Sequence, residues 1–265
     1  MNQLRITTIQ ADLKWENKRA NLEMFSEKIA GSEKSEIVVL PEMFSTGFSM
    51  NPEKFAERMD GETVAWMRDT AFENRKIITG SLMIEENGKF FNRLIWMLPN
   101  GNYGYYNKRH LFAYAQENNH YSPGDSRLIA SVNSWKINLL VCYDLRFPVW
   151  SRQQIKKVNE GEVKPEYDVL IYVANWPSKR IYAWKSLLVA RAIENQCYVV
   201  GVNRIGSDGN NIDYAGESMI IDPLGETLYQ AGDKENIHTS LLEKEMLENT
   251  RNKFPFWKDA DPFSF

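Results

Sequence analysis

The chain has 265 residues, of which 43% are hydrophobic and 25% charged, a balance typical of a globular protein with a sizeable core. Its net charge is −3, from 32 basic and 35 acidic residues without a basic block, which argues against nucleic acid as the main partner because phosphate binding needs clustered Lys and Arg. No uninterrupted apolar segment approaches the ~20 residues of a membrane span and no signal peptide is visible, so we expect a cytoplasmic protein without a membrane partner.

Strands and helices alternate through the first hundred residues. The segment 18–30 predicts an amphipathic helix, because Leu22, Phe25 and Ile29 recur on one face and Gly31 follows as a stop. Glu86-Asn87-Gly88 predicts a hairpin turn between two apolar strands. The expected elements are, in order, a strand at 5–11, the helix at 18–30, a strand in EIVVLPEMF, a helix at 62–74, and strands in KIITGSLMI and FFNRLIWML.

The same alternation continues after Cys142. The expected elements there are a helix, a strand in DVLIYVANWP, a helix in WKSLLVARAIENQ, a strand in CYVVGVNRIG, a polar turn in GSDGNN and a late strand in ESMIIDPLGE. The charged stretch 156–166 is expected to be a solvated helix end followed by a loop. Because we find no repeat, linker or composition break, we expect residues 1–265 to form a single layered α/β domain.

Three predicted strands end in a group with possible reactivity. Glu42 follows VVLP, Lys108 follows GYYN and Cys142 follows LLV. Each alone has a plain explanation, as a cap, a surface cation and an inert core residue respectively. Together they form a sensible set, in which Glu42 is the base for the Cys142 thiol. Lys108 and the backbone N–H of Tyr143 would then stabilise the oxyanion that forms when the sulfur attacks a carbonyl.

Three blocks of sequence resemble the signature blocks of the nitrilase superfamily, the carbon–nitrogen hydrolases. They are LPEMFSTGF (40–48), NKRHLF (107–112) and CYDLRFP (142–148), which follow one another in the order found in that superfamily. The resemblance covers nearly the whole chain, from the first predicted strand to about Trp257. It implies a four-layer αββα sandwich and a Glu-Lys-Cys triad on the residues singled out above. It also implies neither a metal nor an organic cofactor.

The resemblance extends to a second glutamate and to a branch of the superfamily. QENNHYSPGD places Glu117 where many members carry a glutamate that holds the lysine and helps to position the amide; a solvated loop carboxylate is the alternative. CYDLRFPVWSR, YVANWP and ARAIENQ look most like the omega-amidases, which hydrolyse the terminal amide of 2-oxoglutaramate and 2-oxosuccinamate to the dicarboxylate and ammonia. The alternatives are a nitrilase, an N-carbamoyl hydrolase, a deaminated-glutathione amidase or a non-catalytic assembly protein of the same fold.

A substrate of this class carries a carboxylate that needs a cation, because an unpaired buried charge is costly. The candidate cations are Arg146, Lys179, Arg180 and Arg204. Arg146 and Arg191 could equally form structural ion pairs, and we expect such a pair for Arg191, inside its helix. Trp176, in ANWP, is expected either to line the pocket or to pack in the core.

Histidine and metal chemistry have weaker support in the sequence. A Cys–His dyad would have to use His110, His120 or His238, and these three histidines lack the spacing of metal ligands. Cys197 is expected in the core. Two cysteines without a spacing pattern also argue against a disulfide scaffold or a zinc site.

The final twelve positions, 254–265, hold five aromatic residues. Exposed rings at a chain end would form an apolar patch of the kind that soluble monomers avoid, so we expect this tail to be buried. Pro255 and Pro262 stiffen the tail and reduce the entropy lost when it docks. It would pack either on its own subunit or across the interface of a homodimer.

Overall fold

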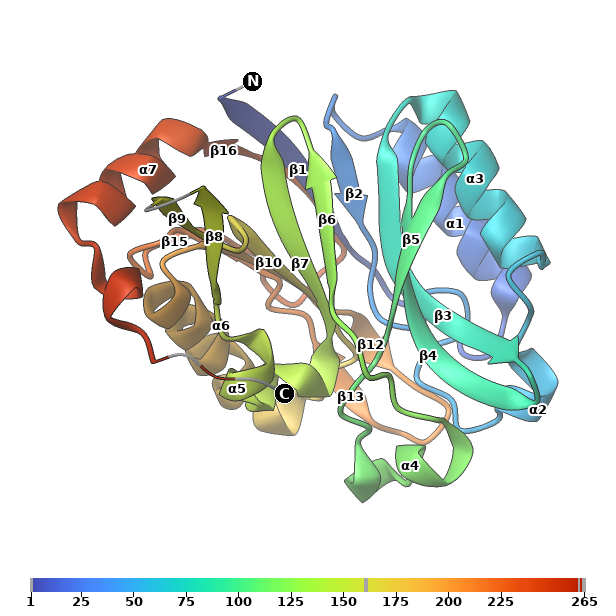
Figure 1. Cartoon of the computed structure of the whole chain (residues 1–265). Helices are drawn as coiled ribbons and strands as arrows, with labels where there is room; N and C mark the ends of the chain where they lie inside the picture. Colours follow the sequence, from blue (N-terminus) through green and yellow to red (C-terminus); the bar gives the residue numbers. More distant parts are fainter. Residues whose placement is uncertain (1, 160–161, 262, 264–265) are drawn as a thin grey trace.

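The structure is a computed structural model that describes residues 2–159, 162–261 and 263. In this part of the chain two six-stranded sheets pack face to face, and helices cover the outer side of each sheet. Helices α1 and α3 lie against the first sheet, and α6 lies against the second (Figure 1). The predicted αββα sandwich is therefore confirmed.

The first sheet has the strand order β16-β1-β2-β3-β4-β5. Strands β1, β2 and β3 run parallel, and the outer pairs are antiparallel. The elements of this half are β1 (Gln3–Gln10), α1 (Lys18–Ala30), β2 (Ile37–Val39), α2 (Pro52–Phe55), α3 (Glu62–Asn74), β3 (Ile77–Glu86), β4 (Lys89–Met97), β5 (Tyr103–Asn107), η1 (Ala113–Ala115), α4 (Glu117–His120) and, from the far end of the chain, β16 (Asn236–Glu243). Helix α7 (Lys244–Lys253) follows β16 but packs on the second half, where Arg251 pairs with Asp168.

The second sheet repeats this plan, with the order β15-β14-β11-β10-β7-β6 and a parallel centre of β7, β10 and β11. Its elements are β6 (Leu128–Val132), β7 (Trp135–Val141), η2 (Cys142–Arg146), α5 (Pro148–Ser151), β10 (Val169–Val173), η3 (Ser178–Arg180), α6 (Ile181–Asn195), β11 (Tyr198–Val202), β14 (Met219–Ile221) and β15 (Thr227–Gln230). Two hairpins stand outside the sheets: β8 (Ile155–Asn159) with β9 (Glu162–Pro165), and β12 (Ile205–Ser207) with β13 (Asp213–Ala215).

Local sequence signals set several boundaries. Helix α1 has the predicted bounds, begins where the Asn17 side chain accepts a hydrogen bond from the Ala20 N–H, and ends at Gly31. Helix α3 also has the predicted bounds. The turn between β3 and β4 holds Asn87 and Gly88 at φ of 54° and 73°, the left-handed values that an Asn-Gly hairpin turn requires.

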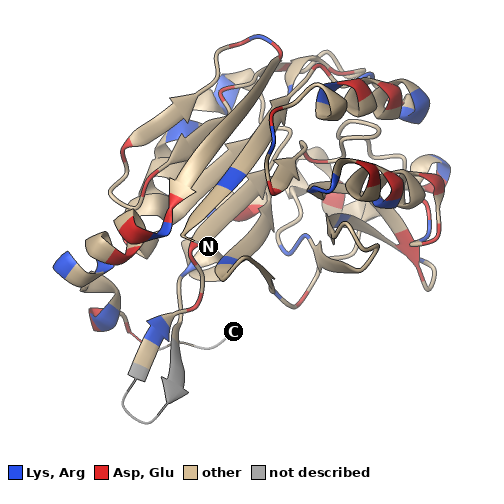
Figure 2. Ribbon diagram, turned by 90° about the horizontal axis from the view of Figure 1, so that it is seen from above, with Lys and Arg blue, Asp and Glu red and all other residues tan. Residues whose placement is uncertain are grey.

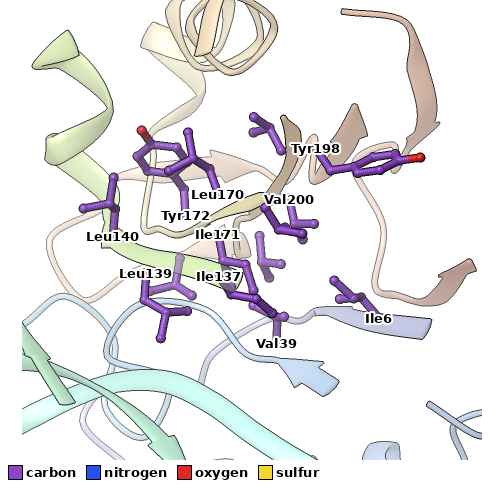
Figure 3. Packing of buried hydrophobic residues seen from close by; sticks show 14 of the residues in the cluster. Ile6, Val39, Ile137, Leu139, Leu140, Leu170, Ile171, Tyr172, Tyr198 and Val200 are labelled. Carbon is purple, nitrogen blue, oxygen red and sulfur yellow. The ribbon is translucent and has the colours of Figure 1, made fainter. Parts of the chain in front are cut away.

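The core fills the space between the sheets and extends to the helices. Residues of β7 and β10 alternate, so that Ile137 and Ile171 face Val39 of the first sheet, while Tyr172 points toward the helical layer (Figure 3). A second cluster joins the outer face of the first sheet to α1 and α3, with Phe25 at its centre. Both parallel strand sets are thus buried on two sides, which rigidly fixes the loops at their ends.

Two predictions about local structure were wrong or incomplete. The charged stretch 156–166 is mainly a hairpin, β8 with β9, instead of a helix end and a loop, with residues 160–161 outside the described part. An antiparallel pair can alternate charged and apolar positions, and this pattern was mistaken for solvated helix. Strand β16 was not predicted; it pairs with β1 along eight residues.

The C-terminal tail lies on its own subunit without burying all its rings. The Gln196 side chain donates to the Phe254 carbonyl at 2.7 Å and accepts from the Trp257 N–H at 3.1 Å. Phe256, by contrast, is 65% exposed, so the expected burial holds only in part. Pro262 and Phe265, on which the prediction also drew, lie outside the described residues.

Lys, Arg, Asp and Glu residues are frequent on the outer helices and less frequent along the strands of the sheets (Figure 2). None of the helices in the described residues is both long and apolar enough to cross a membrane.

Candidate active site

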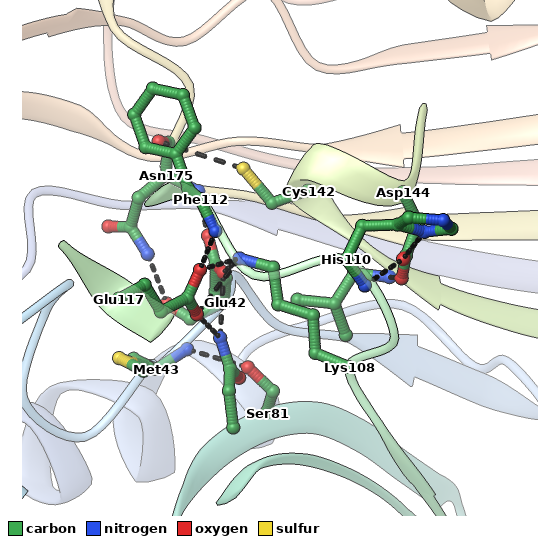
Figure 4. Close-up of polar contacts among 12 residues, drawn as sticks. Glu42, Met43, Ser81, Lys108, His110, Phe112, Glu117, Cys142, Asp144 and Asn175 are labelled. Atoms are coloured by element: carbon green, nitrogen blue, oxygen red, sulfur yellow. Dashed lines mark hydrogen bonds and ion pairs between the residues drawn. The ribbon is translucent and has the colours of Figure 1, made fainter. Parts of the chain in front are cut away.

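The three groups that end predicted strands meet where the two sheets face each other (Figure 4). Glu42 follows β2 and Lys108 follows β5, both in the first sheet, whereas Cys142 follows β7 in the second. Side chains at the carboxyl ends of parallel strands gather at one edge of a sheet, which explains how residues a hundred positions apart come together. Glu117, the first residue of α4, joins them from the loop beyond Lys108.

Lys108 is the centre of a buried ion cluster. Its Nζ lies 2.8 Å from Glu42 Oε1 and 2.9 Å from Glu117 Oε2, and all three side chains are fully buried. Glu117 is therefore not a solvated loop carboxylate, as the alternative had it. An ammonium has three N–H donors, so two carboxylates leave one donor for a third acceptor.

Neutral donors hold both carboxylates in place. Asn92 Nδ2 donates to Glu42 Oε1 at 2.8 Å and to Glu117 Oε1 at 3.1 Å. The Asn175 N–H donates to Glu42 Oε2 at 2.8 Å, and the Phe112 N–H donates to Glu117 Oε2 at 2.6 Å. Buried carboxylates need this many donors, because an unsatisfied ionised oxygen away from water is costly.

Two strained residues set the direction of the reactive side chains. Cys142 has φ of 42° and Met43, immediately after Glu42, has φ of 44°. A non-glycine residue in this left-handed region costs on the order of 1–3 kcal/mol and persists only where its surroundings enforce it. The Met43 N–H donates to Ser81 Oγ at 2.9 Å, which holds the turn beside Glu42 (Figure 4).

Cys142 is 9% exposed and is the first residue of the short helix η2, directly after β7. Its Sγ contacts the carbonyl oxygen of Asn175 at 3.9 Å. Burial raises the pKa of this thiol well above its ordinary value; the charge of Glu42 and a hydrogen bond to it raise the pKa further, and Lys108 opposes them. At neutral pH the sulfur is therefore protonated, and it needs a base before it can attack.

The protonation states of Lys108 and the two glutamates indicate which of them can act as the base for the Cys142 thiol. Burial disfavours the charge on Lys108, but the charges of Glu117 and Glu42 outweigh burial and raise the pKa of the ammonium above its ordinary value. Burial raises the pKa of Glu117 as well; Lys108 opposes this shift, and Glu42 adds to it. A permanently protonated Lys108 donates hydrogen bonds and does not accept protons, so the base must be a carboxylate.

A mainly apolar pocket opens above Cys142. Its walls include Phe48, Phe112, Trp176 and Ile212, and Tyr143 and two arginines add polar atoms. The Tyr143 N–H belongs to the first turn of η2, where a helix offers donors that have no intrahelical acceptor. A reacting carbonyl above the sulfur would lie beside this donor.

Two of the four candidate cations line the pocket. The guanidinium of Arg146 lies 5.0 Å from the centre of the Trp176 ring, and that of Arg180 lies 5.2 Å from the centre of the Phe112 ring. Neither guanidinium has a carboxylate partner among the described residues. Arg204, by contrast, is buried and its Nη2 lies 3.3 Å from Asp12 Oδ1. Lys179 is exposed and does not line the pocket.

Trp176 both lines the pocket and packs in the core, the two alternatives that the sequence left open. It is 3% exposed, lines the pocket, packs against Trp184 and donates from Nε1 to the Arg180 carbonyl at 2.9 Å. Arg191 forms the expected structural ion pair, with Glu194 at 3.0 Å, and also donates to the Leu145 carbonyl.

The alternative nucleophile and bases lie elsewhere. Cys197 is fully buried outside the pocket, and burial raises its pKa. His110 points at Asp144, with its Nδ1 2.8 Å from Oδ1, and not at Cys142 (Figure 4). His238 stacks on Tyr229. The described part of the chain has no group of three or more His, Cys, Asp or Glu side chains placed to bind a metal ion.

Sequence reasoning missed the two asparagines that surround Glu42. Asn92 is a polar residue in the mostly apolar strand β4, and this break in the pattern was the available signal. Asn175 stands in the segment YVANWP, directly before Trp176, the residue of that segment for which a role was predicted. Its side chain donates to the Glu42 carbonyl at 2.6 Å and its own N–H to the carboxylate, so it anchors the glutamate twice.

The chain resembles proteins of one family over its whole length. The family model for carbon-nitrogen hydrolases matches residues 5–252. An omega-amidase, YafV of Escherichia coli strain K12, is 42% identical over 261 residues, 98% of each chain. A 2-oxoglutaramate amidase of Bacillus subtilis is 33% identical and matches 96% of each chain.

Solved structures agree with these relatives. A CN-hydrolase superfamily protein of Xanthomonas campestris, described with an arsenic adduct in its active site, is 42% identical, superimposes with a TM-score of 0.96 and is covered completely. Nit3 of Saccharomyces cerevisiae, a nitrilase-superfamily member, has a TM-score of 0.81 at 22% identity over 96% of this chain and 95% of that one, a likeness of fold. The chain therefore belongs to the carbon–nitrogen hydrolase family.

Proposed function

We propose that this enzyme is an omega-amidase, which cleaves the terminal amide of short 2-oxo dicarboxylic acid monoamides such as 2-oxoglutaramate and 2-oxosuccinamate. The observation that carries the chemistry is the buried cluster of Glu42, Lys108 and Glu117 beside a protonated cysteine in a pocket. The substrate comes from the omega-amidase and 2-oxoglutaramate amidase relatives, which match nearly the full chain.

In the proposed mechanism Glu42 takes the proton of Cys142 as the sulfur attacks the amide carbon. The carbonyl oxygen becomes an oxyanion, which accepts hydrogen bonds from the Lys108 ammonium and the Tyr143 N–H. Glu42 then returns the proton to the amide nitrogen, and ammonia leaves as the C–N bond breaks. A thioester remains on the sulfur.

Water completes the cycle. Glu42 removes a proton from a water molecule, whose oxygen attacks the thioester carbon, and the same donors hold the second oxyanion. The carbon–sulfur bond breaks, the proton passes to the sulfur and the carboxylic acid leaves. Glu117 stays hydrogen-bonded to Lys108 and the Phe112 N–H throughout and keeps the ammonium aimed at the carbonyl.

The proposed substrate also carries a carboxylate next to its 2-oxo group. Arg146 and Arg180 suit it, because both line the pocket and have free donors, while Trp176 and Phe112 support their flat faces. The apolar wall between them fits the methylene chain. The expected products are 2-oxoglutarate or oxaloacetate and ammonia.

We further propose that the enzyme is a homodimer. Exposed apolar side chains on α5, α6 and the tail, namely Val149, Tyr182, Ile193 and Phe256, offer a surface that a second subunit would cover. The mass of the protein in solution tests this part independently of activity.

Ammonia release from a panel of small amides and nitriles tests the proposed activity. We expect 2-oxoglutaramate and 2-oxosuccinamate to have the highest kcat/KM. A preference of tenfold or more for nitriles or carbamoyl amino acids would point to another hydrolase of the superfamily. Absence of turnover on every compound would favour the non-catalytic assembly protein.

A further inference from the structure

Asp144, two residues beyond Cys142, is a fully buried carboxylate with four donors around it. Its Oδ2 accepts hydrogen bonds from the Val141 N–H at 3.0 Å and from the Tyr106 hydroxyl at 2.8 Å. Its Oδ1 accepts from the His110 N–H at 3.0 Å and lies 2.8 Å from His110 Nδ1 (Figure 4). In the Nδ1–H tautomer, His110 donates to Oδ1 as the fourth of these donors.

These four donors come from both sides of the candidate active site. Tyr106 and His110 each lie two residues from Lys108: Tyr106 stands in β5 of the first sheet, and His110 in the chain that follows β5. Val141 immediately precedes Cys142 at the end of β7 in the second sheet. One carboxylate therefore joins the segment that carries the ammonium to the turn that carries the thiol.

The partners of Asp144 are themselves held firmly. The Tyr106 hydroxyl accepts from the Arg109 N–H at 3.1 Å and from Trp150 Nε1 at 2.9 Å. The His110 ring stacks on Phe147, with ring centres 3.8 Å apart. A fully satisfied buried network of this kind rigidifies its surroundings. It leaves Lys108 and Cys142 little freedom to move apart.

We propose that Asp144 is a positioning residue, which fixes the Lys108 ammonium at the place where the oxyanion forms above Cys142. This inference rests on the roles proposed for Lys108 and Cys142. It assigns to Asp144 no contact with substrate. Small displacements matter in such a site, since an error of about 1 Å in the position of a catalytic group costs on the order of 100-fold in rate.

The test is Asp144→Asn, which keeps the shape of the side chain but turns one acceptor into a donor that faces other donors. We expect kcat for amide hydrolysis to fall by about 100-fold while KM changes less than about threefold. Alkylation of Cys142 by iodoacetamide, followed by mass spectrometry of its peptide, is the second readout. Alkylation forms no oxyanion, so it should slow by no more than about threefold.

Asp168→Asn is the matched control. Asp168 is also a buried carboxylate that ties distant segments together, through Lys244, Arg251 and the Lys136 N–H, but it lies away from the pocket. We expect this variant to lose melting temperature and keep the wild-type kcat. If Asp144→Asn does not fold, Tyr106→Phe removes one of the donors to Asp144, together with the acceptor of the Arg109 N–H and Trp150 Nε1. We then expect about a tenfold loss of kcat with unchanged alkylation.

Two outcomes would overturn the proposal. One is a kcat in Asp144→Asn, or in Tyr106→Phe if that variant replaces it, within threefold of the wild type. The other is an equal fall of hydrolysis and alkylation, which would place the effect on the thiol or on the fold. The comparison is a ratio between variants and can be made on any amide or activated ester, such as p-nitrophenyl acetate, that the wild type cleaves. Failure of 2-oxoglutaramate as a substrate would therefore count against the proposed function alone.

Discussion

Lys108→Met removes the one ammonium that faces two buried carboxylates, and its cost in stability can be worked out from the cluster. Glu42 Oε1 and Glu117 Oε2 lie 2.8 and 2.9 Å from Nζ, without solvent exposure. Breaking a buried ion pair by removal of one partner costs about 3–5 kcal/mol. Protonation of one carboxylate relieves part of this cost, so we expect a loss of about 3 kcal/mol at pH 7. A domain with about 5–15 kcal/mol of stability stays folded.

The same change removes a donor from the oxyanion. Loss of one such donor lowers kcat by about 10²–10³-fold, or roughly 3–4 kcal/mol in the barrier. Lys108→Met also lets the two carboxylates share a proton, which leaves Glu42 less able to accept one from Cys142. We therefore expect a fall in kcat of at least about 1,000-fold, beyond what partial unfolding can produce.

Ammonia release at 25 °C and urea unfolding, measured on the same sample, check both numbers. Lys76→Met is the control, because the Lys76 ammonium is also buried but lies far from the pocket. It donates to two neutral acceptors, the Ser32 hydroxyl and the backbone carbonyl of Glu33. The control variant should lose stability and keep the wild-type kcat. A folded Lys108→Met enzyme with more than a tenth of the wild-type kcat would refute the oxyanion role.

The stability of Lys108→Met should also depend on pH in a direction fixed by Glu117. Burial and Glu42 raise the pKa of this carboxyl in the wild type, and Lys108 opposes them, so removal of Lys108 raises the pKa further. An acid whose pKa is higher in the folded than in the unfolded state binds its proton more tightly when folded. The variant should therefore be most stable below the unfolded pKa, about 4.3, and lose stability as pH rises through the folded pKa. Urea midpoints between pH 4 and pH 8 that rise with pH would contradict this.

Four further outcomes are expected. Cys142→Ala should abolish hydrolysis in a folded protein, and Cys197→Ala should leave kcat unchanged; a selective loss in the second variant would mean that the nucleophile is the other cysteine. Arg180→Met and Arg146→Met should each raise KM for 2-oxoglutaramate by roughly 30-fold, since a hydrogen bond to a charged group contributes about 2 kcal/mol, and should leave KM for a neutral amide unchanged. EDTA should not change activity, and inhibition reversed by a divalent metal would overturn the metal-free mechanism. Deletion of residues 254–265 should lower the melting temperature or the oligomer mass in solution. A truncated protein unchanged in both would show that the tail neither stabilises its own subunit nor contributes to a dimer interface.

Much of the fold was predictable because its signals are local. Apolar residues at helical spacing and a following stop set the bounds of α1, and the turn preference of Asn87-Gly88 set the β3–β4 hairpin. Strand β16 was missed for the opposite reason. It pairs with β1 over more than 200 residues of chain, and half of its side chains are exposed, so neither a buried apolar run nor a nearby turn marks it.

The residues of the candidate site likewise fall into those that were predicted from the sequence and those that were missed. Glu42, Lys108 and Cys142 were singled out because each ends a predicted strand with a reactive group, and the resemblance joined them. Asn92 and Asn175 were missed because an uncharged amide is not a reactive group, so that even the polar break at Asn92 in β4 does not indicate a catalytic role. Their importance arises only from contacts across 50 and 133 residues of chain, which the fold creates.

The charges of the cluster explain why the cysteine can rest without reacting. Glu42 and Glu117 together offset the ammonium of Lys108, so a thiolate on Cys142 would add a further negative charge beside these two carboxylates. The thiol therefore keeps its proton, which also slows its oxidation, since the thiolate is the form that oxidants attack. A bound amide changes this balance, because its carbonyl oxygen accepts the charge next to Lys108 and Tyr143 while the proton moves to Glu42. In this scheme Cys142 loses its proton only when a bound carbonyl can accept the negative charge. Attack by the sulfur therefore requires a correctly placed substrate carbonyl.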